Sequence, residues 1–170
     1  DTIRVKIGIG DGGLRKPVYN TAEFKVDDKG IWHGSVKFDV KTNATANFDV
    51  DSAAGYKVLV KPEYHMQRKF CVSSPKETSP GTEKCDKGQV LLKKGVNEID
   101  LSGVIQLVCD IPPGDQDGMC NAKDQALFRS LIGKKDEASL KLGDVNFDGV
   151  VNAVDHSLMI SSMSVRWDEE

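Results

Sequence analysis

The chain is poor in features that mark several large classes of protein. Aromatic residues make up only 6% of its 170 residues. No apolar run approaches the roughly 18 residues that a membrane-spanning helix requires. The 23 basic and 26 acidic residues are interspersed, with a formal net charge of −3, so no clustered basic face indicates nucleic-acid binding. The sequence therefore predicts neither a membrane span nor a nucleic-acid partner.

Motifs of the common catalytic sites are also missing. The sequence has no nucleophile elbow, no His-Glu-x-x-His pair and no glycine-rich phosphate loop followed by a helix. Its three histidines, His33, His65 and His156, stand apart in different contexts. Histidines distant in sequence can still meet in a fold, but nothing else in the chain points to catalysis. We therefore expect a protein that is not an enzyme.

Four cysteines, at positions 71, 85, 109 and 120, are the first positive signal. None forms a Cys-x-x-Cys pair, so the spacing favours disulfides, and hence a secreted protein, over zinc. Of the three possible pairings we favour Cys71 with Cys85 and Cys109 with Cys120. Each bond is expected to contribute about 3 kcal/mol. The alternative interpretation is four buried free thiols in a cytosolic protein.

The most specific motif lies at residues 144–155. Oxygen-bearing side chains occupy loop positions 1, 3, 5, 9 and 12, and a glycine occupies position 6, which is the spacing of a calcium-binding loop. The residues concerned are Asp144, Asn146, Asp148, Gly149, Asn152 and Asp155. Val150, at position 7, offers its backbone carbonyl. We predict one calcium ion here, and the alternative is a polar turn without metal.

An altered copy of this loop lies about 31 residues earlier. Aligning its glycine, Gly118, on Gly149 fills positions 3, 5, 7, 9 and 12 with Asp115, Asp117, Met119 (by its carbonyl), Asn121 and Asp124. Position 1 falls on Pro113, which has no side-chain oxygen. Asp110 takes that position if residues 111–113 form an insertion that bulges out. We therefore predict a second calcium ion at this loop.

An apolar pattern with helical spacing follows each loop. The two sets are Ala126, Leu127, Leu131 and Ile132 after the first loop, and Leu158, Met159, Ile160 and Met163 after the second. A charged linker at residues 134–141 joins the two loop–helix units. Together they form an internal repeat of about thirty residues.

These residues resemble a type I dockerin module. The resemblance covers about residues 107–165 and rests on the duplicated pattern Asp-x-Asn-x-Asp-Gly-x-x-Asn-x-x-Asp, each copy followed by a helix. The second copy matches at every ligand position, and the first departs at position 1. The resemblance implies an all-α module of two EF-hand-like loop–helix units packed antiparallel, two calcium ions, and a cohesin-like or cell-surface protein partner.

The resemblance also implies where a partner is recognised. In dockerins of cellulose-degrading complexes, partner choice usually involves a Ser-Thr pair at loop positions 10 and 11. The corresponding pairs here are Ala122-Lys123 and Ala153-Val154, which depart from that pattern. The module is thus expected either to mediate extracellular or cell-surface assembly, or to support the preceding domain rigidly.

The first hundred residues alternate between apolar and polar side chains. Runs with period two occur at residues 2–9, 22–26, 35–40, 46–50, 56–60, 90–92 and 97–101, separated by turn signals. This pattern predicts a mainly β, Ig-like antiparallel sandwich. The order resembles carboxypeptidase-regulatory-like domains, and the whole chain resembles sandwich-plus-dockerin proteins predicted in uncultured bacteria. We expect two domains, at residues 1–106 and 107–170.

Two places in the β region are candidates for ligand binding. Trp32, at a strand start, is suited to stacking on a sugar ring, whereas Tyr64, His65, Gln67 and Arg68 combine aromatic and polar groups in one loop. The alternative is that Trp32 and Tyr64 pack against the core. A carbohydrate- or peptide-binding module with purely structural calcium is therefore the second functional hypothesis. Residues 43–45 match the N-glycosylation sequon, and the charged tail at 166–170 is expected to fray.

Overall fold

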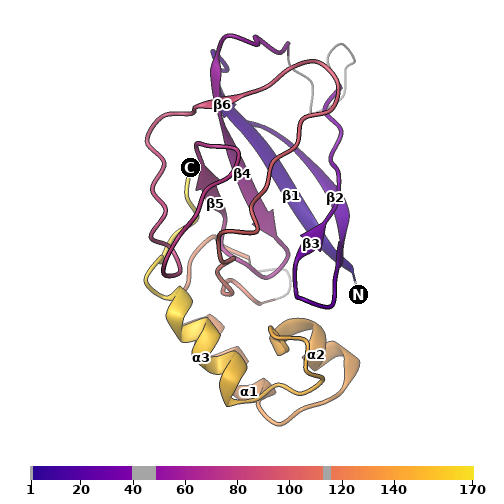
Figure 1. Cartoon of the computed structure of the whole chain (residues 1–170). Coiled ribbons are helices and arrows are strands. Elements are labelled where there is room, and N and C mark those ends of the chain that lie inside the picture. The colour runs from indigo at the N-terminus through magenta and orange to yellow at the C-terminus, as the bar shows by residue number, and fades with distance from the viewer. Residues whose placement is uncertain (1, 40–48, 113–115) are drawn as a thin grey trace.

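The computed structural model describes residues 2–39, 49–112 and 116–170 (Figure 1). Its strands are β1 (Thr2–Asp11), β2 (Val18–Val26), β3 (Trp32–His33), β4 (Gly55–Pro62), β5 (Arg68–Phe70) and β6 (Val90–Leu91). Its helices are α1 (Ala122–Leu131), α2 (Glu137–Gly143) and α3 (Ala153–Ser162). Figure 1 shows the strands gathered in one region and the three helices grouped beyond one end of the sheet. No helix in the described part of the chain is long and apolar enough to cross a membrane.

The strands form one antiparallel sheet in the order β3–β2–β1–β4–β5, and β6 also pairs with β4. The register places Ile7 opposite Val60 and Ile9 opposite Val58. Because side chains alternate between the faces of a strand, these residues share one face. That face carries the core of the β region, formed with Val5, Tyr56, Phe70, Val90 and Leu92.

The predicted sandwich is wrong, because the described residues form a single curled sheet rather than two packed sheets. Irregular chain covers the core instead, through side chains that include Ile99, Leu101 and Val104. The alternating run at 97–101 joins no ladder. The Asn97 side chain bonds the Lys93 amide and carbonyl at 2.9 and 2.8 Å, and Asp100 accepts from the Ser102 amide at 3.0 Å. Such local side-chain bonds compete with strand pairing.

The predicted strand at 35–40 is not formed over its described residues, 35–39. Strand β3 ends at His33, and the next residue, Gly34, lies against the Phe24 ring, where an added Cβ would be 2.5 Å from ring atoms. Beyond it, the Asn20 side chain donates to the Lys37 carbonyl at 2.6 Å. Residue 40, the sequon at 43–45 and residues 46–48 of the next predicted strand lie outside the described residues.

The helices enclose a second hydrophobic core. Its buried members are Met66, Leu107, Val108, Cys109, Ile111, Cys120, Phe128, Leu131, Val151 and Met159. Met66 comes from the turn between β4 and β5, and its amide donates to the Leu107 carbonyl at 2.8 Å. One buried methionine thus ties the sheet region to the helical region across the predicted boundary after residue 106.

The prediction of an all-α C-terminal module is also wrong. Its three helices are short, and extended segments flank them. Val108 forms an isolated antiparallel bridge with His65, and Trp167 forms another with Met119. The linker predicted at 134–141 contains most of α2. Asp136 starts that helix by accepting from the Ser139 amide at 3.0 Å.

The charged tail is paired instead of frayed. The Asp168 amide donates to the Gly118 carbonyl at 2.8 Å, and the Glu169 amide donates to the Gln67 carbonyl at 3.1 Å. The Glu169 carboxylate also accepts from the Lys69 amide at 2.7 Å. The last residues therefore run between the first loop and the β5 edge of the sheet.

Candidate metal centre

The second loop, residues 144–155, joins α2 to α3 and gathers three carboxylates. Ligand oxygens of Asp144, Asp148 and Asp155 all lie within 4.8 Å of one another. Asp144 caps the end of α2, and Asp155 is fully buried in the first turn of α3. Like charges this close are unfavourable unless a cation balances them. The donor set, all oxygen, is the one that calcium prefers.

Backbone amides hold two of these carboxylates in place. Asp144 Oδ2 accepts from the Gly149 amide at 2.8 Å. Asp155 Oδ1 accepts from Val145 at 2.8 Å, and its Oδ2 accepts from Asn152 at 2.9 Å. Gly149 has φ 85°, a left-handed conformation that glycine adopts without steric cost. The loop is therefore tightly turned around its acidic side chains.

The remaining predicted ligands surround Asp148. Its carboxylate accepts from the side-chain amides of Asn146 and Asn152 at 3.0 and 3.1 Å, and from the Val150 amide at 3.0 Å. The Asn146 hydrogen bond contributes most to lowering the pKa of Asp148 below its usual value. The structure thus brings together all six residues that the sequence predicts for the second site.

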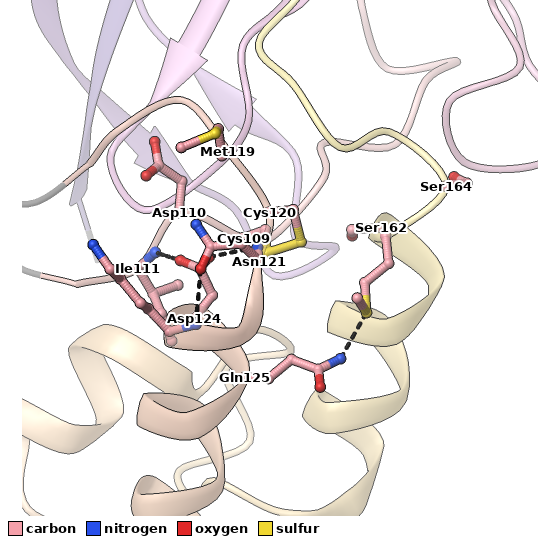
Figure 2. Close-up of a disulfide and its surroundings, with 12 residues drawn as sticks. Cys109, Asp110, Ile111, Met119, Cys120, Asn121, Asp124, Gln125, Ser162 and Ser164 are labelled. Carbon is pink, nitrogen blue, oxygen red and sulfur yellow. Dashed lines mark hydrogen bonds between the residues drawn. A yellow bond between two sulfur atoms is a disulfide. The ribbon is translucent and has the colours of Figure 1, made fainter.

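The first loop repeats this hydrogen-bond pattern. Asp124, buried in the first turn of α1, accepts from the amides of Ile111 at 2.9 Å and Asn121 at 2.8 Å (Figure 2). Those bonds correspond to the bonds of Asp155 with Val145 and Asn152. Asp117 accepts from the Met119 amide at 3.0 Å, as Asp148 does from Val150. The two loops are therefore structural copies as well as sequence copies.

Asp110 occupies position 1 of the first loop. Its Oδ2 accepts from the Gly118 amide at 3.2 Å, the counterpart of the Asp144–Gly149 bond. Seven positions separate Asp110 from Asp117, but only four separate Asp144 from Asp148, so the first loop carries the predicted insertion. Asp115, predicted at position 3, lies outside the described residues.

The surroundings of Asp110 differ from those of Asp144. The Lys61 ammonium, at the end of β4, lies 2.5 Å from Asp110 Oδ2 and 2.9 Å from Asp168 Oδ2. Burial raises the pKa of Asp110, against the lowering effect of Lys61. Sequence reasoning missed both Lys61 and Asp168. Lys61 and Asp168 lie 49 and 58 positions from Asp110 in the chain. The only signal in the sequence was the missing side-chain oxygen at position 1.

The chain that leaves each helix pairs with the opposite loop. Gly133, just after α1, donates to the Val151 carbonyl at 2.7 Å, in the second loop. In the first loop, the Cys120 amide donates to the carbonyl of Arg166, which follows α3, at 3.0 Å. Cys120 and Val151 occupy the same loop position. The two units are therefore related by an approximate two-fold arrangement.

Contacts between α1 and α3 hold the two units together. The rings of Phe128 and His156 stack with centroids 5.6 Å apart. Gln125 Nε2 lies 2.7 Å from the Met163 sulfur, the contact drawn as a dashed line at Gln125 in Figure 2. One contact thus joins α1 to α3, and the other joins α1 to the residue that caps the end of α3.

Both disulfides have the pairing favoured from the sequence, Cys71 with Cys85 and Cys109 with Cys120. Figure 2 shows the second bond directly before α1, beside Asn121 and Asp124. It joins the two ends of the first loop, since Cys109 precedes position 1 and Cys120 precedes the N-cap of α1. The insertion is therefore enclosed by a covalent bridge.

The residues predicted to bind a ligand in the β region are separated. Trp32 and His65 meet edge to face with ring centroids 5.1 Å apart. Tyr64 is half-buried against the helical core. Gln67 and Arg68 are buried, and Arg68 pairs with Glu77. Only Trp32 and His65 of this set face a common opening.

That opening is a groove of about 820 Å³ between the sheet and the helical region. One wall comes from the sheet and includes Phe24, Trp32 and His65. The other comes from the second loop and α3, and includes Phe147 and Leu158. The groove therefore borders the predicted calcium loop.

This geometry defines a class of protein in which two copies of a calcium-type loop, each followed by a helix, pack beside a β sheet. The family model described as Dockerin type I domain matches residues 94–164. This part of the chain is therefore similar to a type I dockerin module, and it follows an N-terminal β region. No curated protein and no solved structure matches the chain.

The matched region starts before the predicted boundary and stops before the paired tail. It includes Leu101 and Val104, which pack on the sheet core, and omits Asp168, which contacts the first loop. Dockerin type I domains bind calcium, and dockerins bind cohesin partners in extracellular assemblies.

Proposed function

We propose that this chain is a secreted, non-enzymatic protein that assembles outside the cell with a cohesin-like partner through its dockerin module. The observation that carries the proposal is the second loop, where three carboxylates converge within 4.8 Å at dockerin spacing. Two disulfides and the dockerin match support an extracellular site of action.

Calcium at the second loop is the basis of this function. The ion is held by Asp144, Asn146, Asp148, the Val150 carbonyl, Asn152 and Asp155. It neutralises carboxylates that otherwise repel one another, and so fixes α3 relative to α2. Binding to the folded state alone stabilises that state by mass action.

The calcium proposal is tested by Asp148→Asn, which keeps the side-chain shape and removes one exposed charge. We expect calcium binding measured by calorimetry to weaken at least about tenfold, and excess chelator to lower the melting temperature of the wild type. Asp86→Asn, at an exposed position outside the module, is the matched control. A wild type that binds no calcium and melts unchanged in chelator would contradict the proposal.

The outer side of α3 supplies the surface for the partner. Val154, at recognition position 11, is 53% exposed, and Leu158, one turn later, is 37% exposed. Residues four apart lie on the same side of a helix. The equivalent positions of α1 are Lys123 and Leu127, so that one of the two is charged. An apolar pair at the rim of α3 is suited to a buried, apolar contact with a partner.

The partner is tested with purified type I cohesin domains. We expect at least one to bind in calcium and to dissociate in chelator. The double variant V154D–L158D should weaken that binding at least about tenfold, because both charges would be buried in the interface. The matched variant L91D–V96D places the same charges at exposed apolar positions of the β region and should bind normally. Failure of every cohesin in excess calcium would contradict this partner class.

The groove beside α3 supports a second candidate, binding of a peptide or a glycan. Trp32, His65 and Phe147 place three rings around its walls, and its volume is that of a small-ligand site. Trp32→Ala separates the candidates: it should abolish binding of a peptide or glycan in the groove while leaving cohesin binding intact. A glycan array together with a peptide library provides the probes.

A further inference from the structure

The described part of the first loop departs from the geometry of the second loop. Among the described residues, its acidic side chains do not form a set of three ligand oxygens within 4.8 Å, whereas those of the second loop do. Asp110 has φ 66°, and the corresponding residue of the second loop, Asp144, has φ −82°. Figure 2 shows the Asp110 carboxylate turned away from that of Asp124. Asp110 Oδ2 is shared between the Gly118 amide of its own loop and the Lys61 ammonium of the sheet.

We propose that Lys61 is the built-in cation of the first loop, so that an ammonium from the sheet replaces calcium there and the chain binds one calcium ion, not two. The inference deepens the proposed function, since it concerns the same dockerin module. The proposed function depends on the second loop, whereas the role of Lys61 depends on its contacts with Asp110 and Asp168.

The contacts of Lys61 are those of a charge that the structure has enclosed. Its ammonium lies 2.5 Å from Asp110 Oδ2, and 3.0 and 2.9 Å from the two oxygens of Asp168. The Asp110 side chain has no exposed surface, and that of Lys61 is 14% exposed. A buried carboxylate requires a compensating partner, and this ammonium provides it from another region of the chain.

Asp110 depends on few groups for that compensation. Its Oδ2 accepts from Lys61 and from the Gly118 amide, and its Oδ1 is buried without a hydrogen-bond partner among the described residues. A calcium ion at this loop would lie close to the fixed ammonium, and the two positive charges would repel each other. The lysine and the ion are therefore alternatives.

The tail completes this arrangement. Asp168 approaches Gly118 so closely that a Cβ added to the glycine would lie 3.0 Å from Asp168 Oδ2. The same carboxylate accepts from the Gln67 amide at 2.6 Å. One ammonium thus connects β4, the first loop and the tail, and holds the dockerin module to the sheet without metal.

The first experiment counts calcium ions by calorimetry and metal analysis. We expect one ion per chain in the wild type and none in Asp144→Asn. Two ions in the wild type would overturn the Lys61 inference and leave the proposed function standing. No ion in the wild type would contradict the proposed calcium site and with it the count of one ion, and the role of Lys61 as the cation of the first loop is then decided by the second experiment.

The second experiment measures melting of Lys61→Met, which keeps the alkyl chain and removes the charge. We expect the melting temperature to fall by about 10 °C. The fall should be the same in calcium and in chelator, because the substitution does not alter the charges of the second loop. Lys57→Met, on the same strand, is the matched control, since its ammonium is 3.7 Å from the carboxylate of Asp11, a side chain that is 33% exposed. The double variant K61M–D110N should recover part of the loss. A loss no greater than in the control, or one that excess calcium reverses, would overturn the inference.

Discussion

The side chains of Arg68 and Glu77 form a two-pronged ion pair in which neither has any exposed surface. Arg68 Nη1 lies 3.3 Å from Glu77 Oε1, and Nη2 lies 3.1 Å from Oε2. The carboxylate also accepts from the amides of Ile105 at 2.8 Å and Glu83 at 3.2 Å. One glutamate therefore fixes β5, the loop closed by the Cys71–Cys85 disulfide, and the chain that leads into the dockerin module.

Glu77→Gln is expected to destabilise the protein by about 3 kcal/mol, because it removes the nearer of the two carboxylates that balance the buried Arg68 charge, and leaves only Glu169 at 3.5 Å. Burial disfavours ionisation of Glu77, but hydrogen bonds from Arg68, Ile105 and Glu83 outweigh it and lower the pKa below the ordinary 4.5. This stabilisation is complete above about pH 4.5 and is lost as the pH falls through the lowered pKa.

Urea unfolding near neutral pH measures the Glu77 effect. Glu98→Gln changes the same side chain at an exposed position and should alter the unfolding free energy by less than about 0.5 kcal/mol. Equal effects of the two substitutions would show that the ion pair contributes nothing to stability.

Protonation of His65 is expected to destabilise the fold. Desolvation lowers the pKa of His65 from 6.5 to about 4, despite the Glu63 carbonyl near Nδ1. The folded state therefore binds fewer protons than the unfolded state between these two values, and the free energy of unfolding falls as the pH decreases from 6.5 towards 4. The total loss is at most about 3 kcal/mol.

Unfolding at about pH 7, 6 and 5 measures this slope. His65→Gln should flatten the part of the curve above pH 5, where carboxylates contribute little. His33→Gln, at a position whose side chain is 65% exposed, is the control and should retain the slope. A wild-type slope that survives in His65→Gln would assign it to another group.

Loss of the Cys109–Cys120 bridge is expected to cost about 3 kcal/mol in the double variant C109S–C120S. The bond encloses the insertion of the first loop and precedes α1 directly, so hydrogen exchange should increase most around Asn121 and Asp124. The variant C71S–C85S removes the other bridge and should instead increase exchange in residues 72–84. The reverse pattern, or a loss below about 0.5 kcal/mol, would contradict this account.

Gly149→Ala is expected to weaken calcium binding and to cost about 1–2 kcal/mol, because alanine is strained at φ 85°. An added Cβ meets no atom within 4 Å, so the cost arises from the backbone. Gly95→Ala is a close control: Gly95 has φ 96° and equally open space, but lies in a turn of the β region. Calorimetry should show weakened calcium binding in Gly149→Ala alone.

The convergence of the second-loop carboxylates could be predicted from the sequence because these residues lie in one short segment of chain. Their spacing is set by a single turn, and Asp144 to Asp155 need no distant partner to take their places. The disulfide pairing followed for a similar reason, since each bond joins cysteines close in the chain. Asp110 was also placed at position 1 once the insertion at 111–113 was allowed.

The architecture of the β region was harder to predict. Alternation at 97–101 is real, but Asn97 and Asp100 bond their own neighbours and leave the segment outside the sheet. Alternation alone reports which side chains are buried, and does not report which backbone groups pair. The contacts of Lys61 and Asp168 depend on residues 107 positions apart, a separation that carries no local signal.

The return of the tail to the sheet also bears on how the module would carry mechanical load. A pull applied to α3 by a bound partner reaches the sheet along two routes, one through residues 106–110 and one through the tail, which pairs with Gln67 and Lys69 beside β5. The tail pairs and the Val108–His65 bridge act in parallel, so tension is shared between them. The dockerin module is therefore joined to its sheet at two points, instead of through a single connecting segment.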